Sequence, residues 1–368
     1  NYTGKQRKNA IEDLNQTIKI LKFYSNNDFA FKDVHNEELF YQNGKILVEV
    51  VQLFEKYRIV YPGRHQFLGD LFEKLLNKGF KQNEGQFFTP IPITRFVWDS
   101  LPLRKIMSNG DGCKYPKVID YACGAGHFLT EAIEAINYFA SLDGKESDNI
   151  WVEKYIFGIE KDYRLARVSK VSMFMNGAGD ANIIFGDGLE NYPDKGIAEL
   201  EFDILVANPP YAVEAFKPHL KLKNNKLAIV DRITNVGSEI ETLFVERIAQ
   251  LVKGRGYAAV ILPNSILNKI NPTSFIEARE VILKNFIVHA IVQCGGKTFN
   301  AATAETVILF LEKYAESPKK EKLAKDSVDG IFSGEDITEW EDKQIFEKYL
   351  EIIECYEKDY LSFIKREK

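Results

Sequence analysis

Residues 118–129 read VIDYACGAGHFL, and this stretch decides the expected fold. Its first four residues predict a short buried strand, Gly124 and Gly126 predict a tight turn, and a helical pattern starts at Phe128. Glycines let the backbone approach a ligand closely, and the N-terminus of the following helix favours negative groups. A single G-x-G after a strand fits an ordinary strand-to-helix turn about equally well, so it indicates the local fold before it indicates a ligand.

Seven β-rich runs separated by helical stretches predict a doubly wound, mostly parallel α/β sheet. The runs are 118–121, 155–159, 182–185, 202–207, 257–262, 287–292 and 306–311. The last run follows the sixth after a short glycine-containing connection. Because that connection has no room for a crossover helix, the last strand should run antiparallel.

Helical patterns flank the sheet region on both sides. Up to about Phe80, apolar residues recur at spacings of three and four, and after Glu312 a lysine- and glutamate-rich stretch leads to an amphipathic pattern. The predicted division is a helical N-terminal region at 1–84, an α/β domain at 85–314, and a charged linker with a helical extension at 315–368.

The composition is that of a folded protein, with 45% apolar and 27% charged residues among 368. Acidic residues outnumber basic ones by 53 to 48, which argues against a protein held to nucleic acid by bulk charge and leaves room for a local basic groove. Four cysteines without a C-x-x-C pair predict a reducing compartment without disulfides. No apolar run approaches the ~18 residues of a spanning helix, so we expect a cytoplasmic protein without membrane association.

Acidic residues end or follow three consecutive predicted strands: Asp120, Glu160 and Asp187. Each one alone is more often a cap or turn residue. The carboxyl ends of parallel strands share one rim, however, and open α/β sheets bind ligands there. A carboxylate at that rim can accept hydrogen bonds from both hydroxyls of a ribose, whereas Asp120 disfavours a pyrophosphate at the glycine turn. The set favours a cationic nucleoside cofactor, for which S-adenosylmethionine is the natural candidate.

The fourth strand ends in NPPY at residues 208–211. Two prolines fix the backbone and remove two N–H donors. The Asn208 side-chain oxygen and the Pro209 carbonyl can each accept a hydrogen bond from a planar amino group, and Tyr211 offers a ring for stacking. The arrangement favours a nitrogen whose lone pair attacks a sulfonium methyl group.

These motifs, in this order, resemble those of S-adenosylmethionine-dependent amino-methyltransferases. Residues 85–90, GQFFTP, are similar to the element that precedes the glycine loop in adenine-N6 DNA methyltransferases, especially modification subunits of type I restriction enzymes and their fused single-chain relatives. The likeness covers 85–311, and its motif order resembles the gamma group. Tyr121, Ala125 and His127 depart from the family, which commonly has proline, threonine or serine, and glycine there.

The resemblance implies a Rossmann-like methyltransferase domain at 85–314 that methylates N6 of a flipped-out adenine in double-stranded DNA. S-adenosylhomocysteine would be the product, and no metal would be needed. The scattered histidines do not have zinc-ligand spacing either. Nothing after Phe310 is long enough for target recognition, so we expect a specificity subunit, or a recognition domain elsewhere in a longer polypeptide, and a restriction helicase or nuclease subunit as a further partner.

The resemblance also assigns site residues. Thr89 and Pro90 would line the methionine end of the cofactor, with Asp120 near its amino group. Glu160 would hold the ribose and Asp187 the adenine amino group. The implied cofactor-binding set is Phe88, Thr89, Pro90, Asp120, Ala122, Cys123, Gly124, Gly126, Phe128, Glu160, Asp187 and Asn208. The implied catalytic set is Asn208, Pro209, Pro210 and Tyr211, and the implied base-stacking pair is Tyr211 and Phe299.

Two questions stay open at this point. The basic residues Lys217, Lys221, Lys223 and Lys226 fit DNA phosphate contacts and a solvated loop about equally well. The alternatives to a DNA methyltransferase are a protein glutamine-amide N-methyltransferase and a non-catalytic assembly subunit that keeps the cofactor fold. Residues 85–90 and the Phe299 loop argue against the first, and the intact NPPY element argues against the second.

Overall fold

The computed structural model describes residues 48–49, 52–53, 89–109, 112–144, 149–178, 181–296, 298, 305–316 and 343–365. The chain divides into two compact units, residues 1–313 and 314–368. Of the predicted helical region at 1–84, only the four residues at 48–49 and 52–53 are described, and they are helical. The three-part division of the chain therefore stays a prediction.

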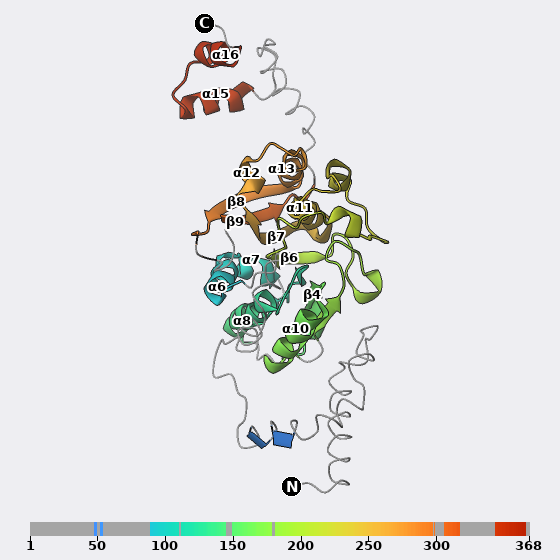
Figure 1. The fold of residues 1–368 in the computed structure, drawn as a ribbon. Coiled ribbons are helices and arrows are strands. Elements are labelled where there is room, and N and C mark those ends of the chain that lie inside the picture. The colour runs from blue at the N-terminus through green and yellow to red at the C-terminus, as the bar shows by residue number, and fades with distance from the viewer. Residues whose placement is uncertain are drawn as a thin grey trace. The chain divides into compact units, whose positions relative to one another are not determined.

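The first unit is built on a seven-stranded sheet with the order β5-β4-β3-β6-β7-β9-β8 (Figure 1). Its strands are β3 (Val118–Asp120), β4 (Ile156–Glu160), β5 (Asn182–Phe185), β6 (Phe202–Ala207), β7 (Val252–Pro263), β8 (Phe286–Gln293) and β9 (Thr306–Lys313). All pairs are parallel except those of β9, which runs antiparallel to both β7 and β8. The predicted mostly parallel sheet and its antiparallel last strand are confirmed, and β9 is inserted between β7 and β8.

Helices cover both faces of this sheet, with α8 and α10 on one side and α11 and α13 on the other (Figure 1). The first face packs against α6 (Ile91–Ser100), α7 (Leu103–Met107), α8 (His127–Leu142), α9 (Val152–Tyr155) and α10 (Tyr163–Met175). The second packs against α11 (Ile240–Leu251), α12 (Ser265–Asn268) and α13 (Ser274–Asn285).

Neighbouring strand residues alternate between the two cores, as Ile204 and Leu205 do, because successive side chains of a strand point to opposite faces. Since both faces are covered, the central strands read as continuous apolar runs.

Short elements complete the fold of the first unit. They are the hairpin of β1 (Ser108–Asn109) and β2 (Gly112–Cys113) and the 3-10 turns η1 (Pro193–Lys195), η2 (Lys217–His219) and η3 (Ala228–Arg232). In the second unit, α15 (Lys343–Ile352) and α16 (Glu357–Lys365) pack around Phe346, Leu350 and Tyr360. Within the described ranges, no helix is both long and apolar enough to cross a membrane.

The turn between β3 and α8 requires its glycines. Gly124 and Gly126 have φ angles of +53° and +86°, in the left-handed region that favours glycine. A Cβ on Gly126 would also lie 2.5 Å from Ser169 Oγ. At Gly124 the space around a Cβ is open, because this residue borders the pocket described below.

Candidate functional site

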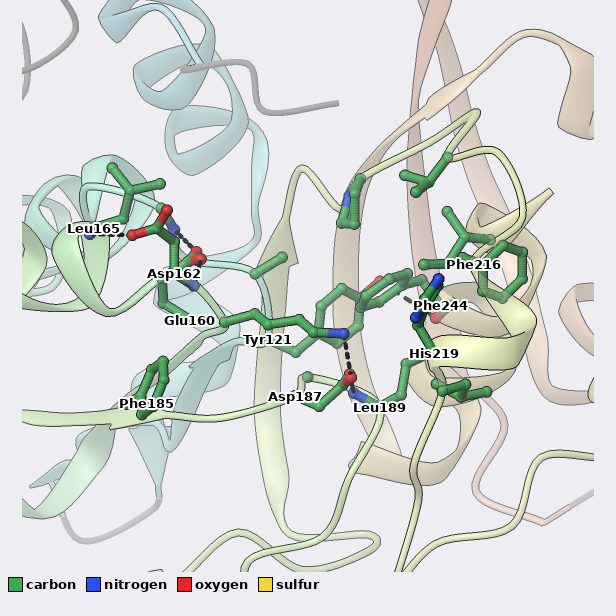
Figure 2. Close-up of a pocket in the computed structure, with 18 of the residues that line it drawn as sticks. Tyr121, Glu160, Asp162, Leu165, Phe185, Asp187, Leu189, Phe216, His219 and Phe244 are labelled. Carbon is green, nitrogen blue, oxygen red and sulfur yellow. Dashed lines mark hydrogen bonds and ion pairs between the residues drawn. The ribbon is translucent and has the colours of Figure 1, made fainter. Parts of the chain in front are cut away.

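A pocket of about 650 Å³ lies at the carboxyl ends of β3, β4, β5 and β6. Figure 2 shows Glu160, Asp162 and Leu165 on one side of it, Phe216, His219 and Phe244 on the other, and Asp187 between them. This is the rim where open α/β sheets bind ligands, as the sequence predicted. Within the described part of the chain, no group of three or more His, Cys, Asp or Glu side chains could hold a metal ion.

Glu160, the last residue of β4, ties the glycine turn to the start of α10. Its Oε2 accepts a hydrogen bond from Gly124 N at 2.8 Å and its Oε1 accepts one from Asp162 N at 2.7 Å. Burial raises the pKa of the Glu160 carboxyl to about 7, although the backbone donors lower it in part. A carboxylate with two fixed donors is held rigidly and keeps further lone pairs for a ligand.

Asp187 lies after β5 and is held in place by its own loop. Its Oδ1 accepts a hydrogen bond from Leu189 N, and its Oδ2 forms an ion pair with Lys161 Nζ at 2.8 Å, drawn as a dashed line in Figure 2. The fully buried Arg247 donates to the carbonyls of Gly188 and Glu190. These contacts fix the loop that presents the Asp187 carboxylate to the pocket.

Asn208 follows β6 and contacts Thr89, which lies two residues before the start of α6. Its Nδ2 donates a hydrogen bond to Thr89 Oγ1 at 3.2 Å, across 119 positions of sequence. Its Oδ1 is buried and has no hydrogen-bond partner among the described residues. A buried acceptor without a partner costs free energy, so it is best explained by a donor that a ligand brings.

The backbone after Asn208 is strained and anchored. Tyr211 is only 4% exposed, and burial raises the pKa of its phenol to about 12. Ala212 has a φ of 54°, in the left-handed region that an alanine rarely adopts. The buried Glu241 accepts a hydrogen bond from Ala212 N at 3.1 Å, which holds this turn in place.

The other predicted site residues are distributed in three ways. Ala122, Gly124 and Pro210 line the pocket. The buried residues outside its lining are Thr89, Asp120, Cys123, Gly126, Phe128, Pro209 and Tyr211, and the half-buried Pro90 also lies outside it. Burial raises the pKa of the Asp120 carboxyl, which accepts a hydrogen bond from Ala122 N. Phe88 and Phe299 lie outside the described residues.

The predicted phosphate-binding lysines do not behave alike. Lys217 is half-buried, and its Nζ donates to Ile233 O at 2.6 Å, so it supports the loop after the NPPY element. Lys221, Lys223 and Lys226 are exposed. The Glu190 carboxylate accepts hydrogen bonds from the backbone of this segment, which keeps it against the domain.

Sequence reasoning missed several residues that line the pocket, namely Lys161, Asp162, Phe216, His219 and Phe244. Lys161 and Asp162 directly follow Glu160, and Asp162 caps α10 by accepting from Arg164 N and Leu165 N, so their position was a usable signal. The segment that holds Phe216 and His219 drew attention only for its lysines. Its apolar residues indicated no contact with the pocket.

The fold is that of class I S-adenosylmethionine-dependent methyltransferases. A solved structure of a putative class I S-adenosylmethionine-dependent methyltransferase from Listeria monocytogenes matches 74% of this chain and 76% of its own, with a TM-score of 0.50 and 19% identity. A type I restriction-modification methyltransferase subunit from Streptococcus thermophilus matches 84% of this chain and 64% of its own, with a TM-score of 0.54 and 16% identity. At these identities the likeness demonstrates a shared fold.

The chain belongs to the N-6 DNA methylase family, whose model matches residues 63–363. Among its relatives, the methylase subunit of the type I restriction enzyme EcoEI from Escherichia coli is 26% identical over 77% of this chain and 53% of that subunit. The methylase subunit of the type I restriction enzyme MjaIX from Methanocaldococcus jannaschii is 25% identical over 67% of this chain and 41% of that subunit. The chain thus spans about half the length of these relatives.

Proposed function

We propose that this chain is the catalytic part of a site-specific DNA methyltransferase that transfers a methyl group from S-adenosylmethionine to N6 of a flipped-out adenine, within a restriction-modification system. The observation that carries the proposal is Asn208 Oδ1, a buried acceptor without a partner among the described residues, on a residue that lines the same pocket as Glu160 and Asp187. Membership of the N-6 DNA methylase family supports the same substrate.

The residues present fit the proposed cofactor. Open space at Gly124 admits a ligand close to the backbone, and the Glu160 carboxylate can accept from ribose hydroxyls while its backbone donors keep it in place. Asp187 can accept from the adenine amino group, beside apolar side chains such as Phe216 and Phe244. Thr89 and Pro90 would face the methionine end. When bound, S-adenosylmethionine supplies the electrophilic sulfonium methyl group.

The target amino group would be held by oxygens of the NPPY element. Asn208 Oδ1 and the Pro209 carbonyl accept its two N–H bonds, which favours a pyramidal nitrogen with a lone pair directed at the methyl group. The proton can leave after attack, so no additional base is required. A paired base cannot reach this pocket, and flipping costs a few kcal/mol. We assign Tyr211 and Phe299 to stacking on the flipped base, which offsets part of that cost. Because the Tyr211 ring is buried outside the pocket lining, its stacking requires a local rearrangement when the base enters.

Recognition of the DNA sequence is assigned to a partner. The relatives are named as subunits of type I restriction enzymes, and this chain spans about half of their length. We therefore propose that a specificity subunit, or a recognition domain elsewhere in a longer polypeptide, supplies readout, with a restriction helicase or nuclease subunit as a further partner. The exposed Lys221, Lys223 and Lys226 would contact phosphates. We propose the cytoplasm as the location.

Tritium transfer tests the proposal. The chain, alone and with candidate specificity subunits, is incubated with labelled S-adenosylmethionine and amplified genomic DNA, which carries no methylated adenine. We expect label in N6-methyladenine after hydrolysis of the DNA. In a parallel reaction that also contains a protein substrate, label in the protein with none in DNA would support the glutamine-amide alternative, which the family match does not favour. Cofactor binding without transfer to either substrate would support the non-catalytic subunit.

Changing Lys161 to methionine should tighten S-adenosylmethionine binding roughly two- to fivefold. The effect should be about 1 kcal/mol or less, because the lysine side chain is 69% exposed and exposed ion pairs are weak. The change frees Asp187 Oδ2 and removes a positive charge beside a site for a cationic ligand. Calorimetry at low and high salt measures the effect, which salt should diminish. Lys154→Met, an exposed lysine on α9, is the control and should bind as wild type does. Weaker binding by Lys161→Met would mean that this lysine contacts the cofactor.

A further inference from the structure

We propose that His127 is a positioning residue that orients the Asn208 amide through Thr89. The inference rests on the proposed function, because it assigns a role in presenting Asn208 Oδ1 to the target amino group. In the present structure, His127 Nδ1 lies 3.0 Å from the carbonyl oxygen of Thr89, and Thr89 Oγ1 accepts the hydrogen bond from Asn208 Nδ2. One residue therefore connects His127 to Asn208.

The chemistry of the first contact fixes its direction. A carbonyl oxygen only accepts, so Nδ1 carries the proton and His127 is the donor. His127 is 6% exposed and is the first residue of α8. His127 begins the helix one residue before the start expected from sequence, and the sequence gave no sign of its contact with Thr89.

Two other contacts join α6 to α8, and they support the contact between His127 and Thr89. Trp98 Nε1 on α6 donates to Phe128 O at 2.8 Å, and Arg95 on α6 pairs with the buried Glu131 on α8. They fix the body of α6 against the first turns of α8. Thr89 lies before the start of α6, and among these contacts only that of His127 reaches it directly.

The hydrogen bond from Asn208 Nδ2 to Thr89 Oγ1 decides the orientation of the Asn208 amide. A primary amide can bind in either of two orientations, and only one leaves its oxygen for the target amino group. With Nδ2 bound to Thr89 Oγ1, Oδ1 is the atom without a partner among the described residues. Holding Thr89 in place therefore keeps the acceptor available before the base arrives, which lowers the reorganisation that the transition state requires.

The test compares His127→Leu, which loses the donor, with His127→Asn, whose side-chain N–H lies at a place similar to that of Nδ1. Single-turnover methyl transfer is measured with amplified genomic DNA in whichever assembly the wild type is active. We expect His127→Leu to transfer roughly 3- to 10-fold more slowly, as for one lost hydrogen bond, and His127→Asn to recover most of the rate. The KM for S-adenosylmethionine should stay within about twofold in both variants.

A double change separates positioning from general damage. In a Thr89→Val background, His127→Leu should cost little more, because the two changes remove the same path to Asn208. His289→Leu is the matched control, since it also removes a histidine hydrogen bond, to Glu312, on the edge strand β8. Its transfer rate should equal that of the wild type.

Each outcome has a definite reading. A wild-type rate in a well-folded His127→Leu, an equal loss in His127→Asn, or a parallel rise in the KM for the cofactor would overturn the positioning role. Wild-type protein that binds S-adenosylmethionine and transfers no label to DNA in any assembly would overturn the proposed function itself, and this inference with it.

Discussion

Replacing Asn208 with alanine is expected to slow methyl transfer to DNA roughly 10²- to 10³-fold while the protein stays folded. The proposed role of Asn208 Oδ1 is to accept from the target amino group as that nitrogen becomes pyramidal, an interaction that grows in the transition state. Losing one such preorganised polar group typically costs about 2.7–4 kcal/mol of transition-state stabilisation. Cofactor affinity should change far less.

The stability of the same variant supplies a second observable. Asn208 Oδ1 is buried without a partner among the described residues, so its removal also removes an unfavourable term. The lost Nδ2 bond to Thr89 is the opposing term, and the melting temperature should remain close to that of the wild type. Asn285→Ala is a suitable control, because the Asn285 amide donates its hydrogen bond within its own helix, to Val281 O. Near-normal turnover by a folded Asn208→Ala would refute the catalytic assignment.

The sheet could be read from sequence because its strands are short apolar runs with turn residues on either side. The predicted ends of the strands were less accurate. β7 begins at Val252 rather than at 257, since its first residues, Lys253 to Gly256, are polar or glycine and do not look like a strand. Backbone pairing with β6 nevertheless includes Val252, opposite Phe202, and resumes at Tyr257 after an irregularity in register. The β1–β2 hairpin was missed because two-residue strands have no periodic pattern.

The site was predictable to the extent that topology alone determines it. Acids at the ends of β4 and β5 must share a rim once the strands are parallel and adjacent, so Glu160 and Asp187 could be brought together from sequence. The contact of Asn208 with Thr89 joins residues 119 positions apart, and no local pattern encodes it. The buried Arg247 behind the Asp187 loop is likewise a tertiary feature, since it reads as an ordinary helix residue.

Of the substitutions at the pocket, replacing Glu160 should weaken S-adenosylmethionine binding most. Hydrogen bonds to a charged acceptor contribute about 1.5–3 kcal/mol each, so losing two ribose hydroxyl contacts in Glu160→Ala should cost roughly 100-fold or more in affinity. Glu160→Gln should also bind poorly. Both carboxylate oxygens accept from backbone N–H groups, and the amide NH₂ would face one of those donors. Undiminished affinity in both variants would exclude the ribose assignment.

The pH dependence of wild-type binding tests the Glu160 carboxylate without a substitution that would leave a cavity. With a pKa of about 7, the Glu160 carboxyl is mostly protonated at pH 6 and mostly ionised at pH 8. If the ionised form binds the ribose, wild-type affinity should rise roughly tenfold between these two values. Glu160→Gln should lack this increase, and titration of the ligand itself cancels because both proteins bind the same ligand.

Without the cofactor, the stability of the protein should follow the opposite trend with pH. A folded-state pKa raised above its usual 4.5 means that the native state holds the proton more tightly than the unfolded chain does, so the contribution of Glu160 to stability falls as pH rises from about 4.5 to about 7. The melting temperature of Glu160→Gln minus that of the wild type should therefore be larger at pH 8 than at pH 6. The same carboxylate would thus lower stability and raise cofactor affinity over one pH range. A melting difference that is flat in pH, together with a flat affinity difference, would mean that Glu160 does not change its protonation state between pH 6 and pH 8.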